Sequence, residues 1–306
     1  MRVIITGGSG LIGTVLTERL LANGHEVIIL SRSPEKYTFP AGVQGVEWDG
    51  KTAGDWHTYI NEDTAIIHLA SINIAGYNFI PNRWTAKRKE VILQSRLEPG
   101  QAMVAAIKAA KQKPKLLIQA SAAGYYGPRE SEIVTESSPP GNDFLANVCV
   151  AWEATTAPVE DMGIRRIVTR TGLVLTMDGG PLPIIVLQYK LFAGGRLGDG
   201  RQWWPWIHLD DEVEAVTYLL ENEAAEGVYN LTAPNPLTND AFGKVVGQVL
   251  NRPHLIPVPA FALKLLLGEI ATLVLDGQRA IPQRLQEAGF IFKYSEAKPA
   301  LADLLK

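Results

Sequence analysis

The feature that most constrains the fold is a glycine-rich turn at the start of the chain. Residues 2–6 form an apolar run that predicts a short buried strand, and apolar residues recur at helical spacing from Leu11 to Leu20. Between these segments stand three glycines: Gly7, Gly10 and Gly13. A strand, glycines at this spacing and a helix form the turn that binds the pyrophosphate of a dinucleotide. The alternative is a glycine turn with a purely structural role.

Each glycine has a physical role in the dinucleotide-binding interpretation. Gly7 allows a tight turn, Gly10 lets the backbone approach the phosphates, and Gly13 lets the helix lie close to the strand. The start of the helix offers free N–H groups and the positive end of its dipole to the phosphates. We therefore expect cofactor contacts from the turn and from the first helical residues: Gly7, Ser9, Gly10, Leu11, Ile12 and Gly13.

The end of the second predicted strand, residues 25–30, indicates which dinucleotide binds. A site for NAD places Asp or Glu about 20 residues beyond the glycines, where it holds the ribose 2′-hydroxyl. This chain has Ser31 and Arg32 instead, a hydroxyl and a guanidinium that suit a 2′-phosphate. We interpret the site as one for NADP(H), with both residues as contacts. Alternatively, Arg32 is an ordinary solvated loop charge like nearby Lys36.

The rest of the chain continues to alternate between strand and helix. A helical pattern covers 90–110. Further buried strands are predicted at 65–70, 115–120, 165–170 and 227–232. This alternation predicts an α/β fold, a doubly wound parallel sheet that binds ligands at the carboxyl ends of its strands. From the turns at those ends we expect further cofactor contacts around one crevice: His68, Leu69, Ala70, Ser121 and Gly172.

The pattern changes at residues 179–181, where Gly-Gly-Pro interrupts it. We predict an NADP-binding domain of residues 1–178, completed by roughly 207–233. Residues 179–206 and 234–306 would form a smaller, mostly helical lobe. That lobe would hold a small-molecule substrate against the cofactor.

Composition and charge argue against several classes of protein. A formal net charge of −3 over 306 residues gives no support for nucleic-acid binding. The most apolar stretch, 261–275, is too short and too charged for a membrane span. Five scattered histidines and one cysteine, Cys149, predict no metal site and no intramolecular disulfide. A lone cysteine fits a reducing, cytoplasmic location, and a first strand that begins at once leaves no room for a signal peptide.

Several motifs resemble the short-chain dehydrogenase/reductase superfamily in its extended, epimerase-like branch. They are the glycine turn, His68-Leu-Ala70, Tyr126-Gly127, residues 206–211 and residues 228–230. Longer motifs resemble one atypical subgroup, usually labelled "epimerase family protein", which has an extra C-terminal domain of unknown function. These are Arg83-Trp-Thr85, Arg88-Lys89, Ser95-Arg96, residues 121–127, residues 144–153 and the tail after Arg252. The resemblance covers essentially the full chain and implies a Rossmann-type fold.

The departures from the family pattern concern proton transfer. Members of the superfamily use Ser, Tyr and Lys; the Tyr is the general acid or base, and the Lys lowers its pKa and binds the nicotinamide ribose. Here the Ser position is Ala122. The Tyr and Lys positions fall on Phe144 and Val148, or on Leu145 and Cys149, depending on the register. Neither pair supplies a phenol and an amine, so the usual proton relay is absent.

Two residues are candidates for catalysis by other means. Tyr125 is the better candidate for a displaced acid, with a place in the pocket wall as the alternative. Ser121 either hydrogen-bonds a substrate carbonyl or satisfies the end of a strand. We interpret Tyr126 and Cys149 as buried packing residues, and we expect His68 to pack against the cofactor without transferring protons.

We predict a structural role for residues 203–211. Its three tryptophans predict packing between lobes or a pocket wall. His208, Asp210 and Asp211 start a helix, and Asp at that place usually caps it.

Two functions stay open from the sequence. One is an NADP-dependent oxidoreductase or epimerase-like enzyme of unknown substrate, because the cofactor carries the hydride chemistry even without the usual relay. The other is a non-catalytic NADP(H)-binding scaffold or redox sensor that a protein partner recognises. We favour the enzyme, because the crevice architecture is retained.

Overall fold

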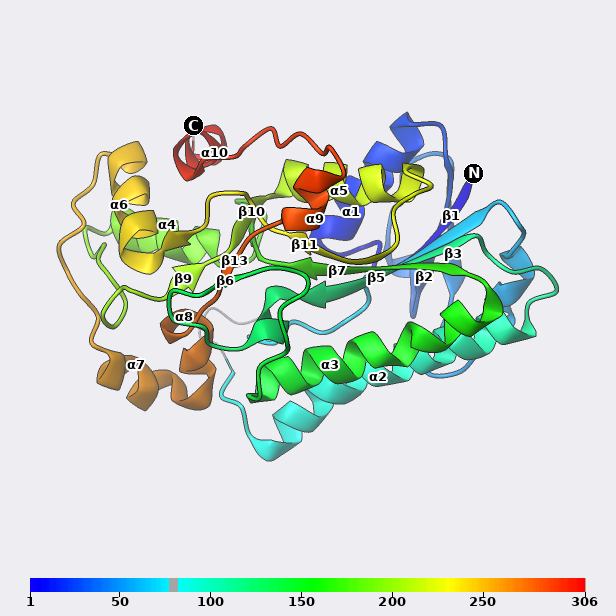
Figure 1. Cartoon of the computed structure of the whole chain (residues 1–306), viewed down its shortest axis with the longest axis horizontal. Coiled ribbons are helices and arrows are strands. Elements are labelled where there is room, and N and C mark those ends of the chain that lie inside the picture. Colours follow the sequence, from blue (N-terminus) through cyan, green and yellow to red (C-terminus); the bar gives the residue numbers. More distant parts are fainter. Residues whose placement is uncertain (77–81, 306) are drawn as a thin grey trace.

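A computed structural model, which describes residues 1–76 and 82–305, is organised around one seven-stranded parallel sheet (Figure 1). The strands lie in the order β11-β7-β5-β4-β1-β2-β3. Their bounds are β1 Arg2–Thr6, β2 Glu26–Ser31, β3 Val43–Glu47, β4 Thr64–His68, β5 Leu116–Ala122, β7 Arg165–Thr171 and β11 Gly227–Leu231. The chain runs outward from β1 to β3 and then returns to β4 on the other side of β1. This reversal is the place where doubly wound sheets bind ligands, and the predicted fold class is confirmed.

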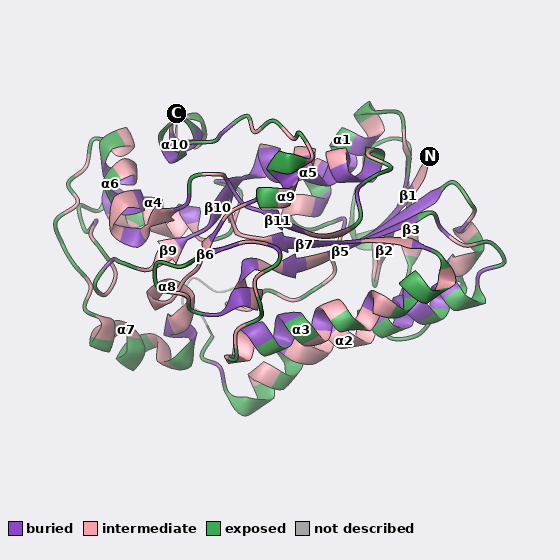
Figure 2. Cartoon of the chain, in the orientation of Figure 1, coloured by how far each residue is buried: buried purple, intermediate pink, exposed green. Residues whose placement is uncertain are grey.

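Apart from the edge strand β3, which has no buried residue, the strands are largely buried on both faces, which is why they read as apolar runs (Figure 2). Neighbouring residues of a strand point to opposite faces, so Ile5 and Ile67 belong to one core and Ile4 and Ile66 to the other. The first core is closed by the helices α1 (Leu11–Ala22) and α5 (Leu209–Glu221), and the second by α2 (Ala86–Ala109). Helix α3 (Phe144–Thr156) lies beside α2 on that second face (Figure 1).

Helix α2 begins earlier than its apolar pattern indicates, because Thr85 caps it. The Oγ1 atom of Thr85 accepts a hydrogen bond from the backbone N–H of Arg88 at 3.2 Å. Further along, α2 crosses α3 at very close range. A Cβ atom built on Gly100 would lie 2.1 Å from Oγ1 of Thr155, so only glycine fits there.

A third core lies beyond the end of β7. It is built by the helices α4 (Leu182–Lys190), α6 (Asn239–Leu250) and α10 (Ala297–Leu304), with the short strands β8 (Leu173–Leu175), β9 (Trp203–Trp204), β10 (Trp206–His208) and β12 (Leu237–Thr238). Trp204 and Trp206 pack inside this core, as the sequence predicted, and the ring of Trp203 lies 4.4 Å below the Arg279 guanidinium. The predicted domain boundaries stay a prediction.

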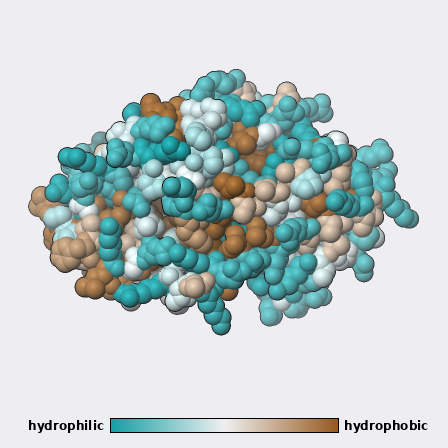
Figure 3. Space-filling model, turned by 60° about the horizontal axis from the view of Figure 1, so that its bottom comes forward, coloured by the Kyte–Doolittle hydropathy of each residue, from teal (hydrophilic) through white to brown (hydrophobic). Residues whose placement is uncertain are grey.

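The C-terminal segment then returns to the sheet. It contains α7 (Ala260–Leu267), the turn η5 (Gly268–Ala271), α8 (Thr272–Leu275), the strand β13 (Arg279–Ala280), which pairs with β6 (Ile133–Val134), and α9 (Gln283–Glu287). Leu285 of α9 packs into the core above the sheet. Helix α7 leaves Phe261, Leu265 and Leu266 exposed. Apolar surface gathers at the lower left of Figure 3, on the side where Figure 1 places α7. No helix among residues 1–76 and 82–305 is both long and apolar enough to cross a membrane.

Candidate functional site

The loops that follow β1, β2, β4, β5 and β7 lie at one edge of the sheet, because these strands are parallel. We call this edge the strand-end surface. It comprises residues 7–13, 31–32, 69–70, 121–127 and 171–172. The sequence predicted that these turns meet, and the topology brings them together.

The glycine turn has the geometry that a dinucleotide requires. Gly7 has φ +74°, and a Cβ on it would lie 3.0 Å from the backbone nitrogen of Ala70. A Cβ on Gly13 would lie 2.3 Å from the carbonyl oxygen of Gly7. Gly10 is exposed and is the N-cap of α1, and neither a side-chain cap nor an acidic residue occupies the first turn. The free N–H groups and the positive end of the helix dipole are therefore available to an anion.

Arg32 stands at the end of β2, next to this turn. Its side chain is exposed, and it makes no hydrogen bond or ion pair with any residue in the described ranges. The neighbouring Ser31 hydroxyl oxygen accepts a hydrogen bond from the backbone N–H of Ser33 at 3.3 Å, which leaves its proton free to donate. Both side chains therefore fit a phosphate.

The expectation that the His68 ring packs against the cofactor is wrong. The residue is fully buried, and its Nδ1 lies 2.7 Å from the Thr6 hydroxyl. Burial lowers the pKa of His68 to about 4, so the ring is neutral. The same Thr6 oxygen accepts the N–H of Ala70 at 3.2 Å. His68 thus fixes the ends of β1 and β4 from behind the surface, while Leu69 and Ala70 are partly exposed.

Ser121 belongs to a buried ionic network. Its hydroxyl donates to Oε1 of Glu153 at 2.6 Å, and the Arg170 guanidinium binds both oxygens of Glu153 at 2.9 Å. Of the two ion-paired side chains, 4% of Arg170 and 12% of Glu153 are exposed. Because its proton is committed to Glu153, Ser121 can only accept a hydrogen bond from a substrate. The alternative that it satisfies the strand end is the one that the geometry favours.

The same guanidinium holds the two tyrosines of the turn η3 (Ala123–Tyr126). Arg170 lies 3.3 Å from the ring centre of Tyr125, which is half-buried. The Tyr125 hydroxyl makes no hydrogen bond within the described part of the chain. Tyr126 is fully buried and donates to Oδ1 of Asn230 at 2.6 Å, as expected of a packing residue. Ser121 and Tyr125 are therefore joined through Glu153 and Arg170.

The structure decides the register of α3 against β5. A Cβ on Gly124 would lie 3.7 Å from Cβ of Leu145, and Cys149 lies against Ser121 and Ala122. Phe144 and Val148 pack in a cluster with Trp84 and Ile270, at whose border Leu145 also lies. Of the two pairs considered for the Tyr and Lys positions, Leu145 and Cys149 are therefore the pair that lies against the end of β5 and η3. Burial raises the pKa of Cys149 to about 12, so its thiol stays protonated and inert.

An apolar contact replaces the relay at position 145. Leu145 packs against a cluster that contains Val148 and, from the C-terminal segment, Ile270, with Leu267 and Leu273 beside them. Partly buried Leu145 thus borders an apolar cluster to which the C-terminal segment contributes, an environment that suits leucine.

The start of α5 differs from expectation in its capping. His208, and neither aspartate, is the N-cap, because its Nδ1 accepts the N–H of Asp210 at 3.0 Å. Asp211 is buried and its carboxylate accepts the backbone N–H groups of Lys293 and Tyr294 at 2.7 and 2.9 Å. Asp211 therefore holds the C-terminal segment through a long-range contact. In the sequence, an Asp at the start of a helix looks the same as a local helix cap.

Two further residues near the end of β7 have structural explanations. A Cβ on Gly172 would lie 2.2 Å from the carbonyl oxygen of Pro205, so the glycine allows two backbone segments to touch. Glu212 is 2% exposed and its Oε1 accepts the Thr171 hydroxyl at 2.8 Å. Burial raises the pKa of Glu212 to about 8, so the carboxyl is mostly protonated at neutral pH. A cofactor contact at Gly172 stays a prediction.

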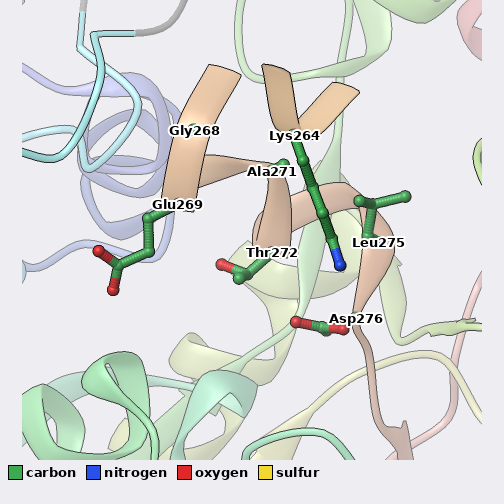
Figure 4. Close-up of a pocket in the computed structure, with 7 residues that line it drawn as sticks. All are labelled: Lys264, Gly268, Glu269, Ala271, Thr272, Leu275 and Asp276. Carbon is green, nitrogen blue, oxygen red and sulfur yellow. The ribbon is translucent and has the colours of Figure 1, made fainter. Parts of the chain in front are cut away.

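A pocket of about 320 Å³ lies within the C-terminal segment (Figure 4). It is lined by Lys264, Gly268, Glu269, Ala271, Thr272, Leu275 and Asp276, and no residue of the strand-end surface lines it. Burial raises the pKa of Asp276, toward which the Lys264 side chain extends in Figure 4. In the described ranges, no group of His, Cys, Asp and Glu could hold a metal ion.

Sequence reasoning missed the parts of the network that lie far apart in the chain. Glu153 is the one charged residue of α3, whereas β7 contains Arg165 and Arg166 besides Arg170. A lone charge on an apolar element, such as Glu153, is a signal of a buried partner. Each was visible in the sequence, but their pairing was not.

Two family models match the chain. The NAD dependent epimerase/dehydratase family matches residues 3–232, and a domain of unknown function, DUF1731, matches residues 258–304. The chloroplastic homolog of epimerase family protein SDR39U1 of Arabidopsis thaliana is 40% identical, over 100% of this chain and 87% of that protein. Epimerase family protein YfhF of Bacillus subtilis is also 40% identical, over 100% of this chain and 98% of that protein.

Solved structures show the same fold. Human epimerase family protein SDR39U1, crystallised with NADPH, superposes with a TM-score of 0.88 at 34% identity, and 99% of each chain is covered. The UDP-glucose 4-epimerase of Thermus thermophilus, in complex with NAD, superposes with a TM-score of 0.77 over 100% of this chain and 98% of that chain. At 19% identity this second likeness concerns the fold alone.

Proposed function

Because the chain belongs to the NAD dependent epimerase/dehydratase family, we propose that it binds NADP(H) at the strand-end surface and moves hydride to or from a small carbonyl or alcohol substrate. Membership of the epimerase family protein subgroup, inferred from the motifs, is confirmed, including its C-terminal domain of unknown function. The cofactor supplies the hydride chemistry when bound. The chain's own residues must bind it, orient it and handle the proton.

The observation that carries the cofactor assignment is the unengaged Arg32 beside the uncapped start of α1. The helix terminus suits the pyrophosphate, and a guanidinium suits the additional 2′-phosphate of NADP(H). The crystal of the human relative with NADPH supports the same choice. The remaining contacts that we propose are Ser9, Leu11 and Ile12 from the turn, Leu69 and Ala70 after β4, and Gly172 after β7.

We expect Arg32→Ala to remove most of the preference for NADPH over NADH. The loss of charge-assisted hydrogen bonds to the 2′-phosphate should cost about 1.5–3 kcal/mol, or roughly 10- to 150-fold in the ratio of dissociation constants. Fluorescence titration with both cofactors measures this ratio. The matched control is Lys36→Ala, which removes an exposed cation from the same loop and should leave the ratio unchanged. Equal affinities of the unmutated protein for NADPH and NADH would exclude the assignment.

Proton transfer is where this chain departs from ordinary members of its family. Leu145 and Cys149 cannot exchange a proton with a substrate at neutral pH. Tyr125 is the proposed acid, because its hydroxyl has no hydrogen-bond partner among residues 1–76 and 82–305 and Arg170 holds its ring. Ser121 acts through Glu153 and Arg170 in this proposal, as a positioning residue.

We expect sugar nucleotides and simple carbonyl compounds to turn over near the background rate even though NADPH binds, because general acid–base catalysis is worth about 10²–10⁴-fold. The experiment is an NADPH-oxidation screen over sugar nucleotides, aldehydes and ketones, repeated with Tyr125→Phe and Ser121→Ala. Ordinary enzymatic turnover of a sugar nucleotide would contradict the loss of the relay. For a substrate that does react, a large drop in Tyr125→Phe identifies the acid, and an unchanged rate assigns the proton to water or to the substrate.

A second function is favoured by the apolar contact at Leu145. If the C-terminal segment permanently covers the position of the phenol, the protein is an NADP(H)-binding scaffold or redox sensor. Its signature would be tight cofactor binding without turnover, together with a protein partner whose binding depends on the oxidation state of the cofactor. Substrate-dependent, stoichiometric oxidation of bound NADPH supports the enzyme instead.

A further inference from the structure

Arg96 is a buried cation on α2 that the proposed chemistry leaves unused. The residue is 8% exposed, and its guanidinium lies 5.0 Å from the ring centre of Trp152. Its Nη1 donates to the carbonyl oxygen of Ile92 at 3.0 Å and to the Ser95 hydroxyl at 3.2 Å. Every partner in the described ranges is a neutral oxygen. A guanidinium so deep in a protein normally has a carboxylate beside it.

The charge of Arg96 is therefore uncompensated. It forms no ion pair with any carboxylate of residues 1–76 and 82–305, and residues 77–81 contain no Asp or Glu. Burial lowers the pKa of Arg96 to about 10, and repulsion by Arg88 of the same helix acts in the same direction. At neutral pH the guanidinium still carries its proton. Burying such a charge is costly, so its retention calls for a function.

The position of Arg96 relates it to the missing lysine. Its Nη2 donates to the carbonyl oxygen of Ile72 at 3.4 Å, in the loop that follows Leu69 and Ala70. Arg96 and Cys149 lie near each other, and Cys149 is the residue that we place at the lysine position of the ordinary relay. In the ordinary relay the positive charge is on the helix that corresponds to α3. In this chain it is on α2, behind the loop after β4.

We propose that Arg96 supplies the positive charge of the nicotinamide end of the site and so makes the protein select NADPH over NADP⁺. This inference rests on the proposed binding of NADP(H), with the nicotinamide at the ends of β4 and β5. The oxidised nicotinamide ring is a cation and the reduced ring is neutral. A fixed buried cation nearby disfavours the oxidised form, and a low local dielectric strengthens the effect.

The experiment is a titration of NADPH and of NADP⁺ against the unmutated protein, Arg96→Met, Arg96→Lys and Arg88→Met. Arg96→Met keeps an unbranched apolar side chain against Trp152 and removes the charge. Arg88 is the matched control: it is also an arginine of α2 and also binds a carbonyl of the loop, that of Asn73 at 2.6 Å, but it is only half-buried, whereas Arg96 is 8% exposed. Losing it loosens the loop and removes a less deeply buried charge.

We expect the ratio of the dissociation constants of NADP⁺ and NADPH to fall about tenfold in Arg96→Met. The midpoint potential of the bound cofactor should fall accordingly by about 30 mV. Arg96→Lys should restore most of the ratio, and Arg88→Met should leave it unchanged even if both affinities drop. If Arg96 had a merely structural role, its replacement would weaken the binding of NADPH and of NADP⁺ to the same extent.

Three results would overturn the proposal: an unchanged ratio in Arg96→Met, a ratio that also falls in Arg88→Met, or equal affinities of the unmutated protein for the two forms. The last needs no variant, so it decides the question even if Arg96→Met does not fold. If the proposed function itself were wrong, neither NADPH nor NADP⁺ would bind. That result differs from all three results that overturn the role of Arg96.

Discussion

Replacing Gly10 with valine is expected to weaken NADPH binding by about a hundredfold or more, about 2.7 kcal/mol, without unfolding the protein. Gly10 has φ −87° and ψ 177°, extended backbone that valine adopts readily. A Cβ there would meet one atom, the carbonyl oxygen of Gly7 at 3.2 Å. The rest of the side chain would project from the exposed surface of the turn, where the pyrophosphate must approach the backbone.

The contrasting variant is Gly13→Val. Its Cβ would lie 2.3 Å from the carbonyl oxygen of Gly7 and 2.7 Å from Cα of Gly8, so the backbone itself would have to move. We expect this variant to lose stability, which Gly10→Val should not. Fluorescence titration and thermal unfolding of both proteins separate the two effects. Unmutated NADPH affinity in Gly10→Val would show that the cofactor lies elsewhere.

Glu153→Ala is expected to lower the free energy of unfolding by about 3–5 kcal/mol, because it leaves a buried guanidinium without its carboxylate. Arg170 would lose both charge-assisted hydrogen bonds, and Ser121 would lose its acceptor. The control is Glu160→Ala, which removes the 54% exposed partner of Arg166 at 2.9 Å. Only the carboxylate of this pair is exposed, and Arg166, at 11% exposure, keeps its hydrogen bonds to Thr156 and Gln119, so the loss should stay near the roughly 0–1 kcal/mol of a surface pair.

Urea denaturation of both variants measures the difference. A cost for Glu153→Ala no larger than that of Glu160→Ala would mean that water reaches Arg170 in solution and that the network does not hold Tyr125. In that case the proposed acid would lack its support.

The fold could be predicted from the sequence because the patterns that indicate it lie within short segments of the chain. Each apolar run is bounded by polar or turn residues, and the order of strands and helices limits the topology to a parallel, doubly wound sheet. The glycine turn was equally accessible, because the positive φ of Gly7 and the close approach at Gly13 are demands that glycine alone meets. The six predicted strands agree with the observed ones within a residue or two. The edge strand β3 was not predicted, because its sequence VQGVE is mostly exposed and gives no apolar run.

The site was less accessible because its contacts join distant segments. Ser121 and Glu153 are 32 residues apart, and Asp211 and Lys293 are 82 apart. The residues around Glu153 in the sequence do not indicate that its side chain points toward β5. For the same reason the sequence could not decide whether α3 presents Phe144 or Leu145 to the site. The expectations for His68 and for the aspartates of α5 failed for this reason. Each was judged by its neighbours in the chain, whereas its role is set by partners across the fold.

The strand order also affects how the chain emerges during synthesis. β1, β2 and β3 become neighbours within the first 47 residues, whereas β7 gains its outer partner β11 only when residues 227–231 exist. Translation adds about 5–20 residues per second, so this apolar edge stays unpaired for several seconds. An open edge of this kind pairs readily with other chains. The nascent protein is therefore most prone to aggregate between the emergence of β7 and that of β11, and its need for chaperones should concentrate in that interval.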